Sequence, residues 1–147
     1  MSAYPKVSID TDINKGLCFG CGQNNPIGLK LSFKKVGDAV KTEFTPGRSY
    51  QGWPGIVHGG ILSCMLDEAM SWAAHGENLN CLTAQMEIRL RQPVKVEQPL
   101  VITGQITKKS RKLIEAKATV CLKDGTLIAE SKSKQFVVDA ESVDAGR

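Results

Sequence analysis

One stretch of the sequence has the apolar spacing of a helix. Seven apolar residues from Ile61 to Ala73 recur every three or four positions. At about 100° per residue they cover an arc of roughly 180° around the helix axis. Such a stripe is wider than the apolar face of an ordinary surface helix. We therefore expect one long helix that is largely enveloped by the rest of the fold.

The other regular patterns are those of strands. Apolar and polar residues alternate from Leu29 to Lys34 and from Val40 to Phe44, with Gly37-Asp38 as the turn of a hairpin. After the helix, the sequence is again β-rich, and turns at 108–112 and 124–125 make the last three strands an antiparallel meander. These later runs cover residues 84–90, 100–106, 113–122 and 126–138. The predicted order is β-β-α-β-β-β-β, an α+β fold in which an antiparallel sheet of five to six strands wraps around one central helix.

Size and composition limit the function classes. The 147 residues fit a single domain with an ordered body over about residues 17–138 and polar tails on either side. No apolar run approaches the roughly 20 residues that span a bilayer, and residues 1–10 contain no apolar segment of a secretory signal. We expect a cytoplasmic protein without membrane contact. Nucleic acid is not an expected partner, because the net charge is only +4 and aromatic residues make up 5%.

The predicted sheet is larger than its helix. A single helix cannot cover six strands, and an open sheet edge pairs readily with other chains. A two-fold dimer that joins the sheets edge to edge or face to face removes this exposure. We predict a homodimer or a dimer-of-dimers tetramer.

The stretch from Gly52 to Ala69 combines a glycine-rich loop, a helix start and an acid within the helix. Gly59 and Gly60 have no side chains, so a ligand oxygen can approach the first free N–H groups of the helix, where the helix dipole favours negative charge. This arrangement is typical of an oxyanion hole, and the alternative is a tight turn packed near the sheet. Asp67 lies in an otherwise apolar helix, where an acid is paired, hydrogen-bonded or functional unless it faces solvent.

The spacing between the glycines and the acid has a further consequence. Asp67 follows Gly60 by seven residues, so both lie on the same side of the helix but roughly 10 Å apart along its axis. One helix therefore cannot bring both groups to one carbonyl. Two copies related by a dimer axis can, with the glycine N–H groups of one subunit opposite Asp67 of the partner subunit. We predict a site shared between subunits.

These features resemble the PaaI-type thioesterases of the hotdog fold, which hydrolyse acyl-coenzyme A. The resemblance extends from Cys18 to Val138 and rests on His58-Gly59-Gly60, on Asp67 nine residues after the histidine, on the loop 52–57, and on Gln92-Pro93-Val94. It implies that the N–H of Gly59 or Gly60 polarises the thioester carbonyl of the acyl-CoA substrate. It also implies that Asp67 of the partner subunit acts as general base or nucleophile, without a metal or an organic cofactor.

Other site residues follow from the same resemblance. His58 is implied to orient the loop or to assist at the carbonyl. Thr83 matches a position where relatives have a serine that orients water, although it is also an ordinary strand residue. Some relatives have an asparagine where this chain has Gly52, and Gln51 is the residue that could replace it. Arg89 is a candidate ligand for the coenzyme A phosphates, with a solvated surface charge as its alternative.

Two other functions are compatible with these residues. One is a non-catalytic hotdog module that binds acyl-CoA, which the presence of Asp67 disfavours because binding alone needs no acid. The other is a hotdog hydroxyacyl dehydratase that uses His58 together with an acid across the dimer. The direct adjacency of His58 to Gly59-Gly60 is typical of a thioesterase instead.

Two further acidic or metal-ligating features are present. Cys18 and Cys21 have the spacing of a zinc half-site or a redox pair, but no second pair follows, and a closed zinc site needs four ligands. The sequence therefore predicts no metal, and the five irregularly spaced cysteines predict free thiols. Glu68 competes with Asp67 as an acid, but it is rotated by about 100° around the helix and points elsewhere.

Overall fold

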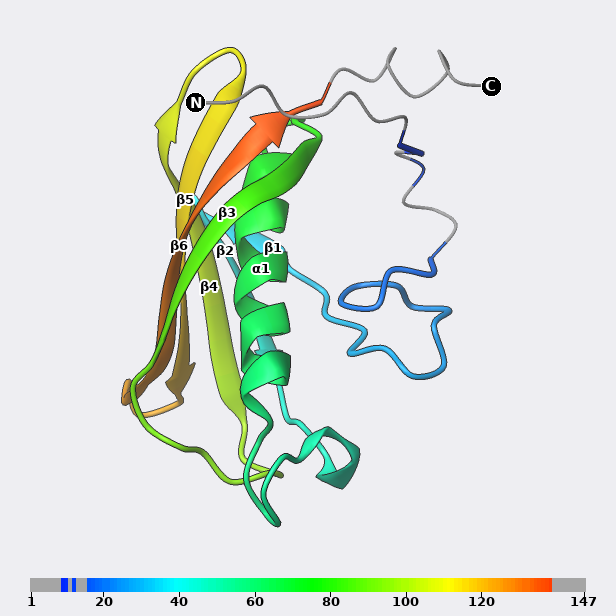
Figure 1. Cartoon of the computed structure of the whole chain (residues 1–147), viewed down its shortest axis with the longest axis vertical. Helices are drawn as coiled ribbons and strands as arrows, with labels where there is room; N and C mark the ends of the chain where they lie inside the picture. Colours follow the sequence, from blue (N-terminus) through cyan, green and yellow to red (C-terminus); the bar gives the residue numbers. More distant parts are fainter. Residues whose placement is uncertain (1–8, 11, 13–15, 139–147) are drawn as a thin grey trace.

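The structure, a computed structural model, describes residues 9–10, 12 and 16–138 (Figure 1). The rest of the predicted tails lies outside the described residues. The elements follow in the order β1 (Lys34–Val36), β2 (Ala39–Phe44), the 3-10 helix η2 (Arg48–Tyr50), α1 (Gly59–His75), β3 (Cys81–Leu90), β4 (Leu100–Lys109), β5 (Leu113–Leu122) and β6 (Leu127–Val137). This sequence of elements confirms the predicted α+β order.

The strands form one antiparallel sheet with the order β1-β2-β4-β5-β6-β3. The pairing of β4 with β5 and of β5 with β6 is the predicted meander. At the turn between β5 and β6, Gly125 has a φ of +94°, a conformation that glycine adopts without steric cost. The chain then places β3 beside β6, so β3 and the short β1 are the two edges of the sheet.

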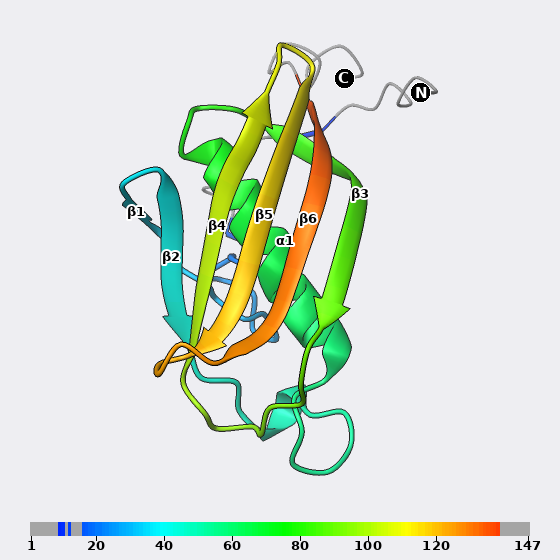
Figure 2. The same cartoon turned by 90° about the vertical axis from the view of Figure 1, so that its left-hand side faces the viewer.

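Helix α1 lies along one face of this curved sheet, as Figures 1 and 2 show from two sides. Its core-facing residues are at most 6% exposed, and from Ile61 to His75 none is classed as solvent-exposed. Contact with β4 is especially close, because a Cβ atom on Gly104 would collide with the backbone carbonyl of Ala69. These observations confirm the expectation of an enveloped helix.

The segment before β1 departs from the predicted hairpin. Leu29 and Leu31 are 3% and 2% exposed, so the alternation correctly indicates which side chains are buried. However, their N–H groups donate to the carbonyls of Phe19 and Gly20, and Lys30 between them has a φ of +55°. The strand is therefore only Lys34–Val36, because residues 29–31 bond to an earlier loop and not to β2.

Strand β3 is longer than predicted. It begins at Cys81 and not at Ala84, and its register with β6 shifts between Thr83 and Gln85. Thr83 and Met86 lie opposite Gln135 and Ser133, so two residues on one face of β3 are three positions apart here, and this extra residue breaks the two-residue period on which strand prediction rests. Within the described part of the chain, no helix has the length and apolar character needed to cross a bilayer.

The close approach of α1 to β4 is testable by substitution. Gly104→Ala places a methyl group against the Ala69 carbonyl and should lower the free energy of unfolding by about 1–3 kcal/mol, as overpacking typically does. Gly47→Ala is the matched control, because its Cβ would have no atom within 4 Å and its φ is −77°. Urea unfolding measures both, and equal stability of the two variants would contradict this packing.

Candidate active site

The start of α1 is capped by the predicted histidine. His58 is the N-cap residue, and its Nδ1 accepts the N–H of Gly60 at 2.8 Å. Its carbonyl accepts the N–H groups of Ile61 and Leu62. Among the described residues, the Gly59 N–H has no acceptor. Of the two predicted carbonyl donors, Gly59 is therefore the one left available, whereas Gly60 is used by the cap.

The loop before the helix is closed by its own hydrogen bonds. The N–H of Gly52 donates to Ile56 O at 2.8 Å, and the N–H of His58 donates to Tyr50 O at 2.9 Å. Gln51 accepts the Gly55 N–H through its amide oxygen at 2.9 Å. Its amide nitrogen, the atom that could donate to a substrate carbonyl, has no partner among the described residues. Gln51 thus remains a predicted substrate contact.

Asp67 and Thr83 come together from neighbouring elements. The Thr83 hydroxyl on β3 donates to Asp67 Oδ1 on α1 at 2.8 Å, and both residues are half-buried. A carboxylate that accepts a hydroxyl proton is held in a fixed orientation. The second oxygen, Oδ2, has no hydrogen-bond donor among the described residues, so it is the atom left for chemistry. The role in orienting water that the resemblance implied for Thr83 stays a prediction.

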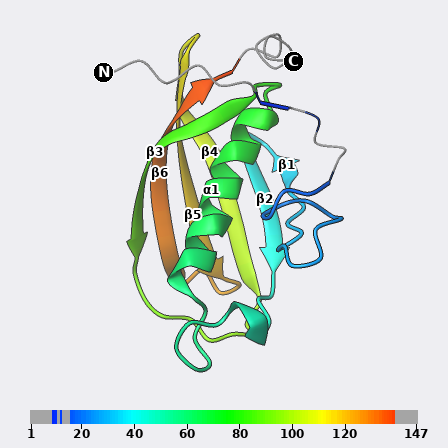
Figure 3. The ribbon, with the colours of Figure 1, turned by 45° about the vertical axis from the view of Figure 1, so that its right-hand side comes forward.

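Within one chain, the glycine and the acid lie at opposite ends of β3. A Cβ atom on Gly59 would lie 3.1 Å from Leu90 Cδ1, at the last residue of the strand. Asp67 contacts Thr83, near its first residue. Asp67 follows Gly59 by eight positions along the helix, which corresponds to about 12 Å along the helix axis. Figure 3 shows β3 passing the upper part of α1 and then following the edge of the sheet downward.

Sequence reasoning missed one polar residue at this end of the sheet. Gln135 on β6 is 0% exposed and lies opposite Thr83 in the strand register. Its Nε2 donates to Ser133 Oγ at 3.1 Å, but its Oε1 is buried and has no partner in the part of the chain that the structure describes. The alternation of Lys132 and Lys134 with Ser133 and Gln135 carried no apolar signal that would mark an inner face.

Glu68 has different neighbours from Asp67, as its rotation predicted. Its Oε1 accepts a hydrogen bond from the Cys18 thiol, with 3.4 Å between Sγ and Oε1. Burial raises the pKa of the Glu68 carboxyl, and the nearby charge of Asp67 raises it further. The two consecutive acids thus lie in separate surroundings, Asp67 beside β3 and Glu68 beside the loop that contains Cys18.

The structure does not bring Arg89 to these groups. On β3 it lies between residues that face the helix, in register with Glu130, and its nearest ion-pair partner is Glu87 at 3.9 Å. Both side chains are mostly exposed, which makes this pair energetically weak. Strand alternation therefore places Arg89 on the outer face, and its contact with phosphates stays a prediction.

Comparison with known proteins identifies the family. Residues 54–129 match the family model described as the thioesterase superfamily. The chain belongs to the thioesterase superfamily. The matched segment of this superfamily contains the helix start, Asp67 and Thr83, whereas Cys18 and Cys21 precede it.

Individual members of the thioesterase superfamily agree with this assignment. The bovine acyl-coenzyme A thioesterase THEM4 is 27% identical over 140 residues, which is 93% of this chain and 58% of that protein. The chain thus spans little more than half the length of this curated relative. The thioesterase superfamily protein RHA08564 has 25% identity and a TM-score of 0.78, over 91% of this chain and 69% of its own.

The E. coli PaaI protein from the phenylacetic acid degradation operon has the same fold. It has 15% identity and a TM-score of 0.70, over 76% of this chain and 81% of its own. The hotdog fold that the sequence resemblance implied is thereby confirmed.

Proposed function

We propose that the protein hydrolyses acyl-coenzyme A thioesters to a carboxylic acid and coenzyme A at a site shared by two subunits. One observation supports this proposal most directly. The Gly59 N–H lies beside the last residue of the edge strand β3, and Asp67, which is hydrogen-bonded to Thr83, lies near its first residue. Membership of the thioesterase superfamily and the similarity to an acyl-coenzyme A thioesterase support this reaction.

The edge position of β3 supports the dimer. This strand has ten residues and, within the described sheet, pairs only with β6, so its other side is open to a further strand. If two β3 strands pair antiparallel about a two-fold axis, the Leu90 end of one chain lies beside the Thr83 end of the other. The operation that closes the open edge therefore brings Gly59 to Asp67 of the partner subunit. A dimer of such dimers keeps this arrangement.

The reaction then needs few groups. The Gly59 N–H donates to the thioester oxygen, and the helix dipole stabilises the negative charge that develops there. Asp67 of the partner subunit either takes a proton from water, which attacks the carbonyl carbon, or attacks that carbon itself and forms a mixed anhydride, which water then hydrolyses to the acid. The carbon–sulfur bond breaks when the tetrahedral intermediate collapses, and coenzyme A leaves as a thiolate that is then protonated. Thr83 is a positioning residue, since its hydroxyl holds Asp67.

The cap geometry argues against the dehydratase alternative. Because His58 Nδ1 accepts the Gly60 N–H, the neutral imidazole carries its proton on Nε2. Such a ring has no free basic nitrogen with which to abstract a substrate proton unless the cap opens. His58 is therefore a positioning residue in this proposal, and its effect on the substrate passes through the orientation of Gly59 and Gly60.

A location in a reducing cytosol stays a prediction. All five cysteines are described, and all five are free thiols. This is the state that a reducing compartment maintains.

Removal of the acid tests the reaction itself. Asp67→Asn and Asp67→Ala should each lower kcat by at least ~100-fold, the scale of a missing general base. Release of free coenzyme A from a panel of acyl-CoAs measures this, and size-exclusion chromatography shows whether assembly is unchanged. Normal hydrolysis by both variants would contradict the mechanism, whereas acyl-CoA binding without turnover by the wild type would identify a non-catalytic module.

Removal of the amide proton tests the carbonyl site. Gly59 is the first residue of α1, where proline is best tolerated, and His58 before it has a ψ of 134°, which suits a residue preceding proline. Gly59→Pro should therefore preserve the helix and lower kcat by about 100-fold, as expected for a lost oxyanion donor. Gly59→Ala keeps the N–H and adds only a methyl group near Leu90. Equal losses in both variants would contradict a role for the N–H group.

A mixture of two inactive variants tests whether the site is shared. In a dimer of one Asp67→Asn chain and one Gly59→Pro chain, one site contains both intact groups and the other contains neither. Random mixing at equal amounts makes half of the dimers mixed, so about one quarter of the wild-type activity should return. Co-refolding of the variants followed by the coenzyme A assay measures this recovery. No recovery despite mixed dimers would indicate that each site lies within one chain.

A further inference from the structure

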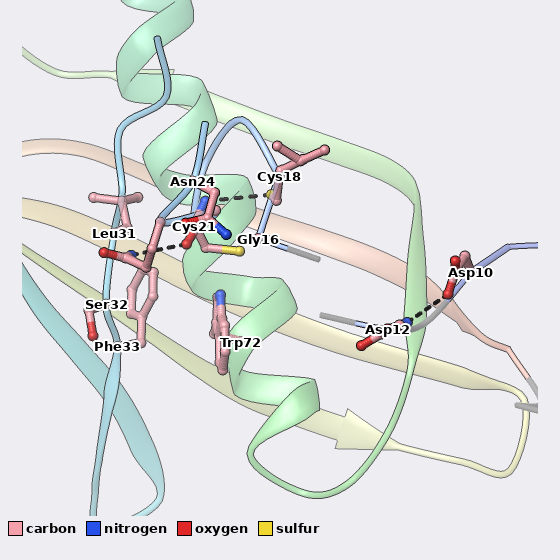
Figure 4. A pocket seen from close by; sticks show the side chains of 13 residues that line it. Asp10, Asp12, Gly16, Cys18, Cys21, Asn24, Leu31, Ser32, Phe33 and Trp72 are labelled. Atoms are coloured by element: carbon pink, nitrogen blue, oxygen red, sulfur yellow. Dashed lines mark hydrogen bonds between the residues drawn. The ribbon is translucent and has the colours of Figure 1, made fainter. Parts of the chain in front are cut away.

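Three metal-ligating side chains from distant parts of the sequence meet beside α1. They are Cys18 and Cys21, from the loop 16–24, and Glu68, from the helix. Each offers one ligand atom, and these atoms all lie within 4.8 Å of one another. Figure 4 shows the two cysteines on their loop, above the part of α1 that carries Trp72. No sequence pattern joins Glu68 to the cysteines, because about 50 residues separate them.

The loop is shaped to bring its thiols to the carboxylate. A Cβ atom on Gly20 would collide with the Glu68 side chain, and one on Gly22 would collide with the backbone around Cys18. Glycine at both positions therefore permits the close approach. The Gly22 N–H donates to Cys18 O at 2.8 Å, and the Cys21 N–H donates to Cys18 Sγ at 3.5 Å. Backbone bonds from Leu29 and Leu31 fix the other side of the loop.

All three side chains of this cluster are acids, which become negatively charged when they lose a proton. Burial raises the pKa of the Cys21 thiol to about 12, and the negative charge of Glu68 contributes. Among residues 16–138, no lysine, arginine or histidine forms an ion pair with Glu68. Three groups that all become negative when deprotonated thus lie together, with no ion-pair partner among the described residues. A divalent ion would supply a positive charge and stabilise both thiolates.

We propose that Cys18, Cys21 and Glu68 form a binding site for a thiolate-preferring divalent metal ion such as Zn²⁺. Two thiolates from a Cys-x-x-Cys turn and one carboxylate are ligands that zinc accepts in tetrahedral geometry. Both cysteines line a cavity of about 570 Å³ beside Trp72, which leaves room for water as a fourth ligand. The ion would fasten the loop 16–24 to α1 at the residue next to Asp67. This proposal does not depend on the thioesterase activity.

A redox role for the cysteine pair fits the same geometry less well. Reactive Cys-x-x-Cys thiols have lowered pKa values, because the thiolate is the nucleophile. Here burial and Glu68 act in the opposite direction on Cys21. A bound metal ion would stabilise the Cys21 thiolate and so oppose the rise in its pKa, which suits a structural metal site.

Metal content and cobalt spectra test the proposal on the full chain under reducing conditions. After dialysis against Zn²⁺ and removal of the excess, mass spectrometry should find about one zinc per chain. Titration of the metal-free protein with Co²⁺ should produce thiolate-to-cobalt charge-transfer absorption and the visible bands of tetrahedral cobalt. A chelator should lower the Tm of the zinc-loaded protein, and added Zn²⁺ should restore it.

Substitutions assign the ligands. Cys18→Ser, Cys21→Ser and Glu68→Gln should each weaken Co²⁺ binding by at least roughly 100-fold, since loss of a direct ligand exceeds the effect of an outer-shell change. Cys121→Ser is the matched control, because this cysteine lies on β5, outside the cluster, and should leave binding unchanged. Circular dichroism shows which variants are folded, and the wild-type cobalt spectrum is decisive even if a cysteine variant is not.

Three results would overturn the site. The first is reduced wild-type protein that takes up no stoichiometric zinc or cobalt. The second is wild-type affinity in the folded Glu68→Gln or Cys18→Ser variant. The third is a Cys18–Cys21 disulfide, detected by mass, in a protein that still binds no metal after reduction.

Discussion

The burial of α1 against the sheet is the interaction on which the rest of the structure depends. Gly104 allows the helix backbone to reach β4 directly, and the apolar side of the helix is fully covered. A helix packed in this way cannot rotate about its axis, so the direction in which each of its remaining side chains leaves the helix is set as well. Asp67 faces β3 and Thr83, while Glu68, about 100° away, faces the cysteine loop. Apolar packing on one side therefore sets the polar chemistry on the other.

A rigid helix also explains why one chain is not sufficient for the proposed reaction. The distance from the free Gly59 N–H to Asp67 is set by helical rise, and no side-chain rotation brings both groups to one carbonyl. In the proposed dimer, two-fold pairing of the open β3 edge would compensate for this distance, because it reverses the direction of the strand that accompanies the helix. The proposed assembly and the proposed catalysis thus depend on the same edge, so a change that blocks strand pairing would also remove the proposed site.

Much of this fold follows from local patterns, and what does not follow has a common cause. The helix, its start at the glycine pair and the meander were predictable, because periodicity and turn residues act over a few positions, and an acid in an apolar helix predicted a partner for Asp67. The same patterns report that a side chain is buried but not against what. Leu29 and Leu31 are buried as expected, yet they bond to the cysteine loop and not to a hairpin partner. The unpaired Oε1 of Gln135 and the contact of Glu68 with Cys18 also depend on tertiary neighbours, whereas the hydrogen bond from the Gly60 N–H to His58 depends on the side-chain conformation of the N-cap residue.

The segment before the matched family region is physically continuous with the helix start. The Tyr50 hydroxyl donates to Gly28 O at 3.0 Å, and the Tyr50 carbonyl accepts the His58 N–H. Gly28 belongs to the stretch whose backbone is bonded to the cysteine loop, since its own N–H donates to Asn25 O and the next residue bonds to Phe19 O. A metal ion bound at Glu68, as proposed, would therefore also restrain, through this stretch, the residue whose carbonyl bonds to the N-cap His58. Hydrogen bonds thus connect the cysteine loop to both polar parts of the candidate site, to the residue beside Asp67 through Glu68 and to the helix start through Tyr50.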